Sequence, residues 1–136
     1  MSRRDARRHI FNLMFQNEFN KEINTHESIE TYRNEYENFE RKDILFIKNE
    51  YTGILENVEK IDSIIDKFIG WSVDRLSTVD KAILRIAVYE IMFDDDIPNK
   101  VSVNEAVELA KEFSEDKAPS FINGVLGKVV RYKEAN

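Results

Sequence analysis

The sequence predicts an all-α protein. Apolar residues recur at three- and four-residue intervals along most of the 136-residue chain, which is the spacing that places side chains on one face of an α-helix. Capping signals punctuate these segments, and no run of alternating apolar and polar residues indicates a strand. With 42% hydrophobic residues, the chain can bury a core, so we expect a single domain over residues 1–136 with six or seven helices.

The first helix is expected over residues 5–20, and a weaker, charged helical segment over residues 26–39 with Thr25 as a candidate N-cap. One side of the first helix carries its apolar residues: Ala6, Ile10, Leu13 and Met14. A long apolar-periodic run then covers residues 43–69 and ends at Gly70, a suitable C-cap residue. This run fits either one helix or two.

The next helix is expected to start at Ser77, with Asp80 three residues further on. Its core stripe comprises Val79, Ile83, Ile86 and Ala87. Glu90 also falls in this stripe, and a buried carboxylate must be paired or protonated. We therefore expect Glu90 to have a structural partner such as a lysine or arginine, whereas Arg85, off the stripe, is expected to form an ion pair or to snorkel.

Residues 94–99, "DDDIPN", break the periodicity. A further helix is expected to open with Ser102 and Glu105 in capping-box spacing. Its shared face comprises Val103, Ala106, Val107, Ala110 and Phe113. The last helix should begin near Pro119, because proline is tolerated in a first turn.

The stretch "FINGVL" at residues 121–126 contains Asn-Gly, a strong signal for a β-hairpin. Its flanks have helical spacing instead, so we expect a helix, in which Gly124 costs about 1 kcal/mol relative to alanine. The outer flank of this helix gathers four residues within about 80°, namely Phe121, Gly124, Lys128 and Arg131. Glycine permits a close approach there, either by another helix of the chain or by an external ligand.

The N-terminal end is basic although the chain is acidic. Four arginines against one aspartate give residues 1–9 a charge of +3 and leave −9 on the rest, for a net charge of −6. Two of these arginines and two aromatic rings lie within about 60° on a helix, namely Arg4, Arg8, Phe11 and Phe15. Cations interleaved with rings suit single-stranded nucleic acid. For the arginines, the alternative is a solvated basic tail. For Phe11 and Phe15, the alternative is packing under a second helix.

Nothing in the sequence indicates catalysis or a cofactor. There is no cysteine, and the two histidines, His9 and His26, lie in unrelated segments. The acidic triplet at 94–96 is typical of a solvated turn rather than a metal site. Because no catalytic constellation stands out, we expect a protein that is not an enzyme. No signal peptide or membrane span is evident, so we expect it to be cytoplasmic.

Three segments of the chain read "RRDARRHIFNLMFQNEF", "WSVDRLSTVDKAILRIAVYEI" and "IPNKVSVNEAVELAKEFSEDKAPSFINGVLGKVV". Together they resemble the NusB family of bacterial transcription antitermination proteins. They follow in order from about Arg3 to Val130, and the spans 71–91 and 97–126 are the most specific. The resemblance implies an all-helical fold of about seven helices in two small bundles. It also implies a factor that binds boxA RNA, notably of ribosomal RNA operons, together with NusE, and that joins NusA, NusG and RNA polymerase.

The resemblance assigns RNA contact to Arg3, Arg4, Arg7, Phe15, Phe121 and Asn123. The flanks described above add Arg8 and Lys128 to this set. It assigns NusE contact to Asp74 and Asp80. The sequence departs from the family at Phe15, where tyrosine is common, and at Gly127, where an acidic residue is usual.

Two alternatives belong to other classes. A helical protein-interaction scaffold without direct RNA binding would need no basic face. A hydrolase would need a constellation of carboxylates or histidines, and Glu90 and His9 are the residues whose substitution would test for one.

Overall fold

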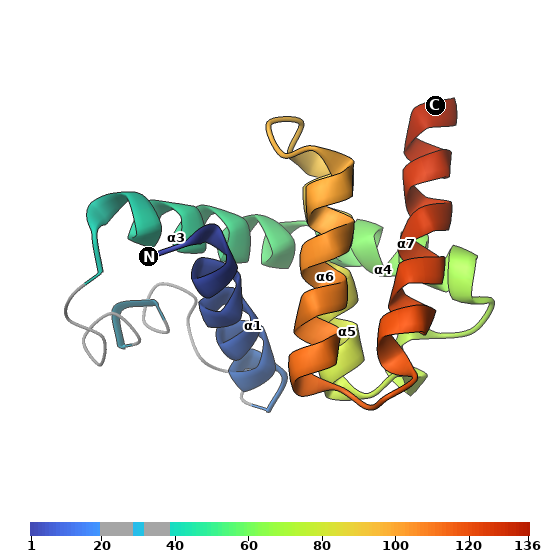
Figure 1. Cartoon of the computed structure of the whole chain (residues 1–136), viewed down its shortest axis with the longest axis horizontal. Helices are drawn as coiled ribbons and strands as arrows, with labels where there is room; N and C mark the ends of the chain where they lie inside the picture. Colours follow the sequence, from blue (N-terminus) through green and yellow to red (C-terminus); the bar gives the residue numbers. More distant parts are fainter. Residues whose placement is uncertain (20–28, 32–38) are drawn as a thin grey trace. The chain divides into compact units, whose positions relative to one another are not determined.

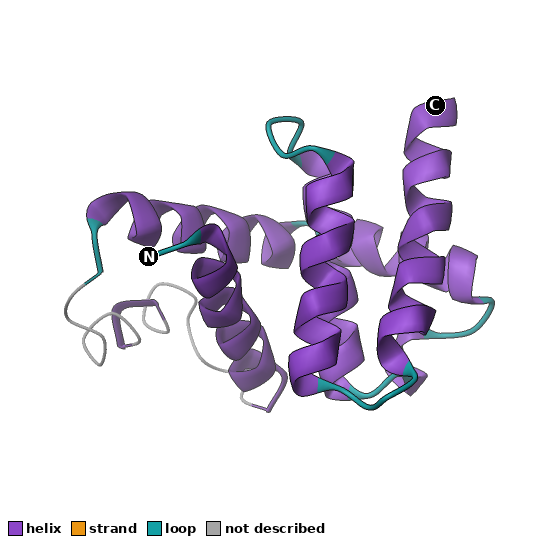
Figure 2. Ribbon diagram, in the orientation of Figure 1, coloured by secondary structure: helices purple, strands orange, loops and turns teal. Residues whose placement is uncertain are grey.

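The computed structural model describes residues 1–19, 29–31 and 39–136, which form two compact units, Met1–Glu56 and Asn57–Asn136. All regular secondary structure in these described residues is helical (Figures 1 and 2). The elements with defined bounds are α1 (Arg3–Phe19), α3 (Arg41–Glu56), α4 (Val58–Ile69), the 3-10 turn η1 (Val73–Arg75), α5 (Thr78–Phe93), α6 (Asn99–Phe113) and α7 (Ala118–Ala135). The all-α prediction is confirmed. Of the expected segment 26–39, only 29–31, which are helical, and 39 are described, and Thr25 lies outside the described residues.

In the first unit, α1 packs against α3. The predicted face of α1 is buried as expected, because these residues recur at the helical period and meet an apolar face of α3. The buried core of the first unit includes Ala6, Ile10, Leu13 and Met14 on α1, and Ile47, Tyr51 and Ile54 on α3. This core fixes which side of α1 remains available to solvent.

The run 43–69 forms two helices. Asn57, with φ −115° and ψ 15°, separates α3 from α4. Gly70 ends α4 in the left-handed conformation, with φ 80°, and its N–H donates to the Asp66 carbonyl oxygen at 3.0 Å. This confirms Gly70 as the C-cap, a position where residues with a Cβ are strained.

In the second unit, α5 packs against α4, α6 and α7. Figure 1 shows α6 and α7 side by side with α5 behind them. Ser77 caps α5 as predicted, because its Oγ accepts from the Asp80 N–H at 3.1 Å. Arg85 forms the expected ion pair, donating from Nε and Nη2 to the two Asp62 carboxylate oxygens at 2.9 and 2.8 Å and so joining α5 to α4. Such bidentate pairs fix geometry as well as charge.

The predicted start of α6 at Ser102 is wrong. The helix begins at Asn99 after Pro98, and Ser102 is buried in its first turns. The Ser102 hydroxyl donates to Glu90 Oε1 at 2.8 Å, which makes Ser102 a structural partner of the buried carboxylate. The apolar face also turns out narrower than expected, since Phe113 is exposed and Val103 only partly buried.

The segment "FINGVL" lies inside α7, which begins at Ala118 with Pro119 in its first turn. The helix prediction is therefore confirmed and the hairpin excluded. The buried face matches the predicted one: Ile122, Val125, Leu126 and Val129. The opposite flank of α7 is consequently the one that carries residues 123, 124 and 128, all of which are exposed.

Candidate nucleic-acid interface

The basic end of the chain forms the first turns of α1. Arg4 is exposed, and Arg8, partly exposed, pairs with Asp5 at 2.6 Å between Nη1 and Oδ1. Hydrogen bonding with Ser2 lowers the pKa of Asp5 from its usual value; desolvation opposes this shift and Arg8 reinforces it, so this carboxylate stays ionised at neutral pH. The Arg8 side chain is thus oriented by one fixed negative charge.

Arg3 and Arg7 meet the ring of Phe46 on α3. The Arg3 guanidinium carbon lies 4.2 Å from the ring centroid, and that of Arg7 lies 5.6 Å away. Arg3 also reaches within 3.8 Å of the buried Asp43 carboxylate, yet half of its side chain remains exposed. Arg7 is only 4% exposed. Its expected contact with RNA stays a prediction, while its position in this structure is that of a support beneath the basic turn.

His9 is mostly neutral at neutral pH. Burial lowers the pKa of its imidazole from its usual value, and the nearby Asp5 only partly opposes this effect. The ring packs against Phe39 with centroids 4.7 Å apart. The positive charge of this end therefore comes mainly from the arginines, together with the N-terminal ammonium, which pairs with Asp43 at 3.3 Å.

Three phenylalanines follow one another along α1 at four-residue intervals. Phe11 is buried, as the packing alternative proposed, whereas Phe15 is half-buried. Phe19, one turn further along the same flank, is 70% exposed and contacts Phe15 with centroids 5.0 Å apart. The accessible rings of this flank therefore lie nearer the end of α1 than predicted, at Phe15 and Phe19.

The outer flank of α7 is open and positively charged. A Cβ built at Gly124 would meet no atom within 4 Å, so no other helix of the described chain makes the close approach there. Asn123, Lys128 and Arg131 are exposed, and neither of the two cations forms an ion pair with a described residue. Of the two explanations for Gly124, the internal one is thus not supported.

Gly124→Ala is expected to raise the free energy of unfolding by about 0.5–1 kcal/mol, because alanine is the better helix former and the new methyl meets open space. Urea unfolding followed by circular dichroism measures this change. Gly70→Ala is the matched control, and it should destabilise because Gly70 has φ 80°. A loss of stability in Gly124→Ala would contradict an open flank.

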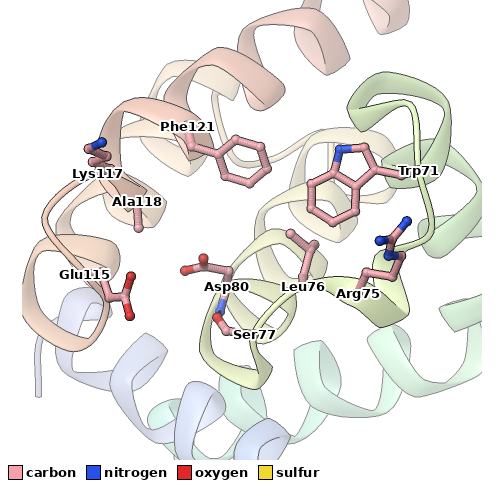
Figure 3. A pocket seen from close by; sticks show the side chains of 9 residues that line it. All are labelled: Trp71, Arg75, Leu76, Ser77, Asp80, Glu115, Lys117, Ala118 and Phe121. Carbon is pink, nitrogen blue, oxygen red and sulfur yellow. The ribbon is translucent and has the colours of Figure 1, made fainter.

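A pocket of about 320 Å³ opens at the start of α7, within the second unit. Figure 3 shows the Phe121 and Trp71 rings along one side of the pocket, with Asp80 and Ser77 opposite them. The two rings are stacked, with centroids 6.4 Å apart and planes 19° from parallel. The remaining lining residues are Arg75, Leu76, Glu115, Lys117 and Ala118. Phe121 thus stands between this pocket and the open flank of α7.

The two predicted NusE contacts have different environments. Asp74 is exposed in η1, just before α5 rather than within it, and its backbone N–H donates to Ser72 Oγ at 3.2 Å. Asp80 is partly buried in the first turn of α5, and its Oδ1 accepts from the Ser114 hydroxyl at 2.6 Å. Asp74 is therefore available to a partner, whereas Asp80 also joins the start of α5 to the end of α6.

Two side chains of the acidic triplet at 94–96 form polar contacts. Asp94 Oδ1 accepts from the Asp96 N–H at 3.1 Å, and Asp95 pairs with Lys133 at 3.1 Å. Within the described ranges, no group of three or more histidine, aspartate or glutamate side chains is placed to hold a metal ion. No helix there has the length and apolar character needed to cross a membrane.

Trp71 is the residue of this region that sequence reasoning missed as a functional candidate. It is the single tryptophan of the chain, it follows the C-cap Gly70 and it is 40% exposed. A large ring directly after a helix end, in a segment of polar residues, was the available signal. Its proximity to Phe121, fifty residues away, depends on how η1 and α7 pack and has no signature in sequence spacing.

These features define an all-helical protein that displays arginines, lysines and aromatic rings on α1 and α7. Residues 4–131 match the model of the NusB family. The chain belongs to the NusB family.

Relatives and solved structures agree over nearly the whole chain. A Transcription antitermination protein NusB from Clostridium novyi is 44% identical, covering 96% of this chain and 99% of its own. One from Agathobacter rectalis is 42% identical, covering 94% and 98%. A structure of T. maritima NusB has a TM-score of 0.88 at 33% identity, covering 96% of this chain and 92% of that one. A structure of antitermination factors NusB and NusE in complex with double-stranded RNA has a TM-score of 0.86 at 28% identity, covering 96% of each.

Proposed function

We propose that this chain is a transcription antitermination factor that binds boxA RNA of nascent transcripts, notably those of ribosomal RNA operons, together with NusE. In this proposal the pair joins NusA, NusG and RNA polymerase in the cytoplasm and makes elongation resistant to termination. The chain acts by binding alone, without a catalytic residue or cofactor.

One observation carries the proposal: the chain shares family and fold, over 96% of its length, with a NusB that is seen with NusE and RNA. The surface chemistry of this chain supports it independently. The helices α1 and α7 carry exposed arginines, an exposed lysine and half-buried aromatic rings. Such cations hold phosphates, and such rings stack on unpaired bases.

On α1, exposed Arg4 and partly exposed Arg8 would contact phosphates, and Arg3 would do so from its exposed half. Phe15 would stack on a base. Arg7, which is buried, would mainly hold the turn in place unless RNA draws it out.

On α7, Phe121 would stack on a base and Asn123 would hydrogen-bond to a base edge or the sugar. The exposed cations Lys128 and Arg131 would contact phosphates. Gly124 between them leaves room for the RNA backbone beside the helix.

NusE would dock on the acidic side chains around the start of α5, with exposed Asp74 as the direct contact. Asp80 would contribute through its second carboxylate oxygen, since its first accepts from Ser114. Electrostatic complementarity of this kind mainly sets orientation and association rate.

The proposal is tested by titrating labelled boxA-like RNA, a scrambled RNA of equal length and a boxA duplex, each with and without NusE, at two salt concentrations. We expect the single-stranded boxA RNA to bind most tightly, and NusE to raise its apparent affinity by adding contacts or ordering the site. Equal binding of all three RNAs under every condition would rule out specific recognition. Binding to NusE with no binding to any RNA would instead identify a scaffold.

Asp74→Asn tests the NusE surface separately. This variant should weaken NusE binding in calorimetry while leaving the affinity for RNA alone unchanged, because the lost charge lies on the protein-docking side. Asp96→Asn is the matched control, since Asp96 is also exposed and acidic within the second unit. Equal effects of the two variants would mean that only net charge matters.

A further inference from the structure

We propose that Trp71 is a further RNA-binding residue, which together with Phe121 takes one unpaired base of the bound strand at the mouth of the pocket lined by Asp80 and Lys117. This inference rests on the proposed RNA binding and adds to it a base-binding pocket. The ligand is a single nucleobase of single-stranded RNA.

The two rings form an aromatic platform. Their planes are only 19° from parallel, and their centroids are 6.4 Å apart, near the outer limit for a stacked aromatic pair. The indole of Trp71 is 40% exposed although it is the largest apolar side chain available for burial. A base stacked on its open surface would extend the stack that Phe121 begins, as bases do on aromatic side chains in single-stranded RNA complexes.

The local backbone holds Trp71 in place from both sides. Gly70 precedes it and ends α4 in the left-handed conformation. Beyond it, the Val73 N–H donates to Asp66 Oδ1 at 2.6 Å, and Ser72 caps η1. A platform fixed before binding loses little conformational entropy when a base stacks on it.

The pocket offers hydrogen-bonding groups to the edge of a base. Its volume of about 320 Å³ is at the small end of ligand pockets, which suits one base rather than a larger molecule. Ser77 lies beside Asp80 in Figure 3, and its hydroxyl, whose oxygen accepts from the Asp80 N–H at 3.1 Å, can still donate a hydrogen bond. The charged side chains at the rim, Arg75, Glu115 and Lys117, form no ion pair with a described residue and so remain available.

The chain contains a built-in reporter of this contact, because Trp71 is its single tryptophan. RNA binding is measured by the anisotropy of end-labelled boxA-like RNA, and stacking by the intrinsic fluorescence of the protein with unlabelled RNA. We expect the fluorescence to be quenched with the same midpoint as the anisotropy. An RNA in which a single base is removed should bind more weakly, with less quenching, at one position of the series.

Trp71→Ala is expected to weaken RNA binding by about 5- to 150-fold, the range measured for loss of one base–aromatic stack. Trp71→Phe should restore most of the affinity because it retains a ring. Phe93→Ala is the matched control: Phe93 is also 40% exposed and stacked, on Tyr89, but does not line the pocket. This control should bind RNA like the unmodified chain.

The outcomes separate this inference from the proposed function. If RNA raises the anisotropy but leaves the tryptophan fluorescence and the affinity of Trp71→Ala unchanged, the base pocket is wrong and RNA binding stands. If Trp71→Ala and Phe93→Ala lose affinity equally, the effect is one of general stability and the pocket is also wrong. If no RNA binds at any salt concentration, both are wrong.

Discussion

Leu126→Ala is expected to lower the free energy of unfolding by about 2–5 kcal/mol. Leu126 is fully buried on α7, the helix that packs against α4, α5 and α6. The truncated side chain loses its transfer free energy and leaves a cavity that close-packed neighbours fill only in part. Because α7 also carries Phe121 and Asn123, the same variant should loosen the flank that we propose binds RNA.

Equilibrium urea unfolding, followed by helical circular dichroism, measures this loss. Leu45→Ala makes the same chemical change at a side chain that is 44% exposed, so it should cost less than about 1 kcal/mol. Similar losses in the two variants would show that burial at Leu126 contributes little, and would contradict the packing of α7 described above.

The helical pattern of this chain was predictable because its apolar residues obey one period. α7 is the clearest case, since Ile122, Val125 and Leu126 are all buried as their spacing indicates. That period outweighed the hairpin signal of Asn123-Gly124, because a hairpin also requires alternating strands around it. The cap signals at Ser77 and Gly70 were equally reliable, each depending only on neighbouring residues.

Predictions failed where distant segments decide the role of a residue. Ser102 and Glu105 have capping-box spacing, yet Ser102 bonds to Glu90 because α5 and α6 pack together there. Asn57, which separates α3 from α4, offers no proline or glycine as a warning. The pattern left one helix or two equally open for this reason.

The candidate site shows the same division. Exposure of Arg4 and Lys128 follows from their distance from the apolar faces of their helices, and periodicity finds them. Burial of Arg7 does not, because it depends on the Phe46 ring of another helix. Trp71 and Phe121 likewise meet only through tertiary packing, so no spacing rule could place them in one pocket.

Removing two cations from α1 and two from α7 is expected to weaken RNA binding by about 600-fold at 0.1 M salt. Each phosphate contact on a single strand contributes about −0.7 to the slope of the log binding constant against the log salt concentration. One contact therefore strengthens binding about fivefold at 0.1 M salt relative to 1 M salt. Arg4→Ala with Arg8→Ala should therefore cost about 25-fold, and Lys128→Ala with Arg131→Ala should cost the same again.

The matched control removes two cations that are outside the proposed contacts, Lys111 and Lys133. These pair with Glu108 at 3.4 Å and Asp95 at 3.1 Å, and their loss changes the net charge by the same amount. Salt titrations of this double variant should show the slope of the unmodified chain. A slope reduced as much as in the other double variants would mean that RNA responds to net charge rather than to the two helices.

Comparing the two pairs decides whether one RNA strand uses both units of the protein. If α1 and α7 each hold phosphates of the same strand, each pair lowers the slope by about 1.4 and the combined variant by about 2.8, because separate contacts add. If only one pair changes the slope, the RNA lies on that helix alone and the other basic flank serves a different purpose. If removing the two α7 cations leaves the slope unchanged, RNA binding does not explain the open surface at Gly124.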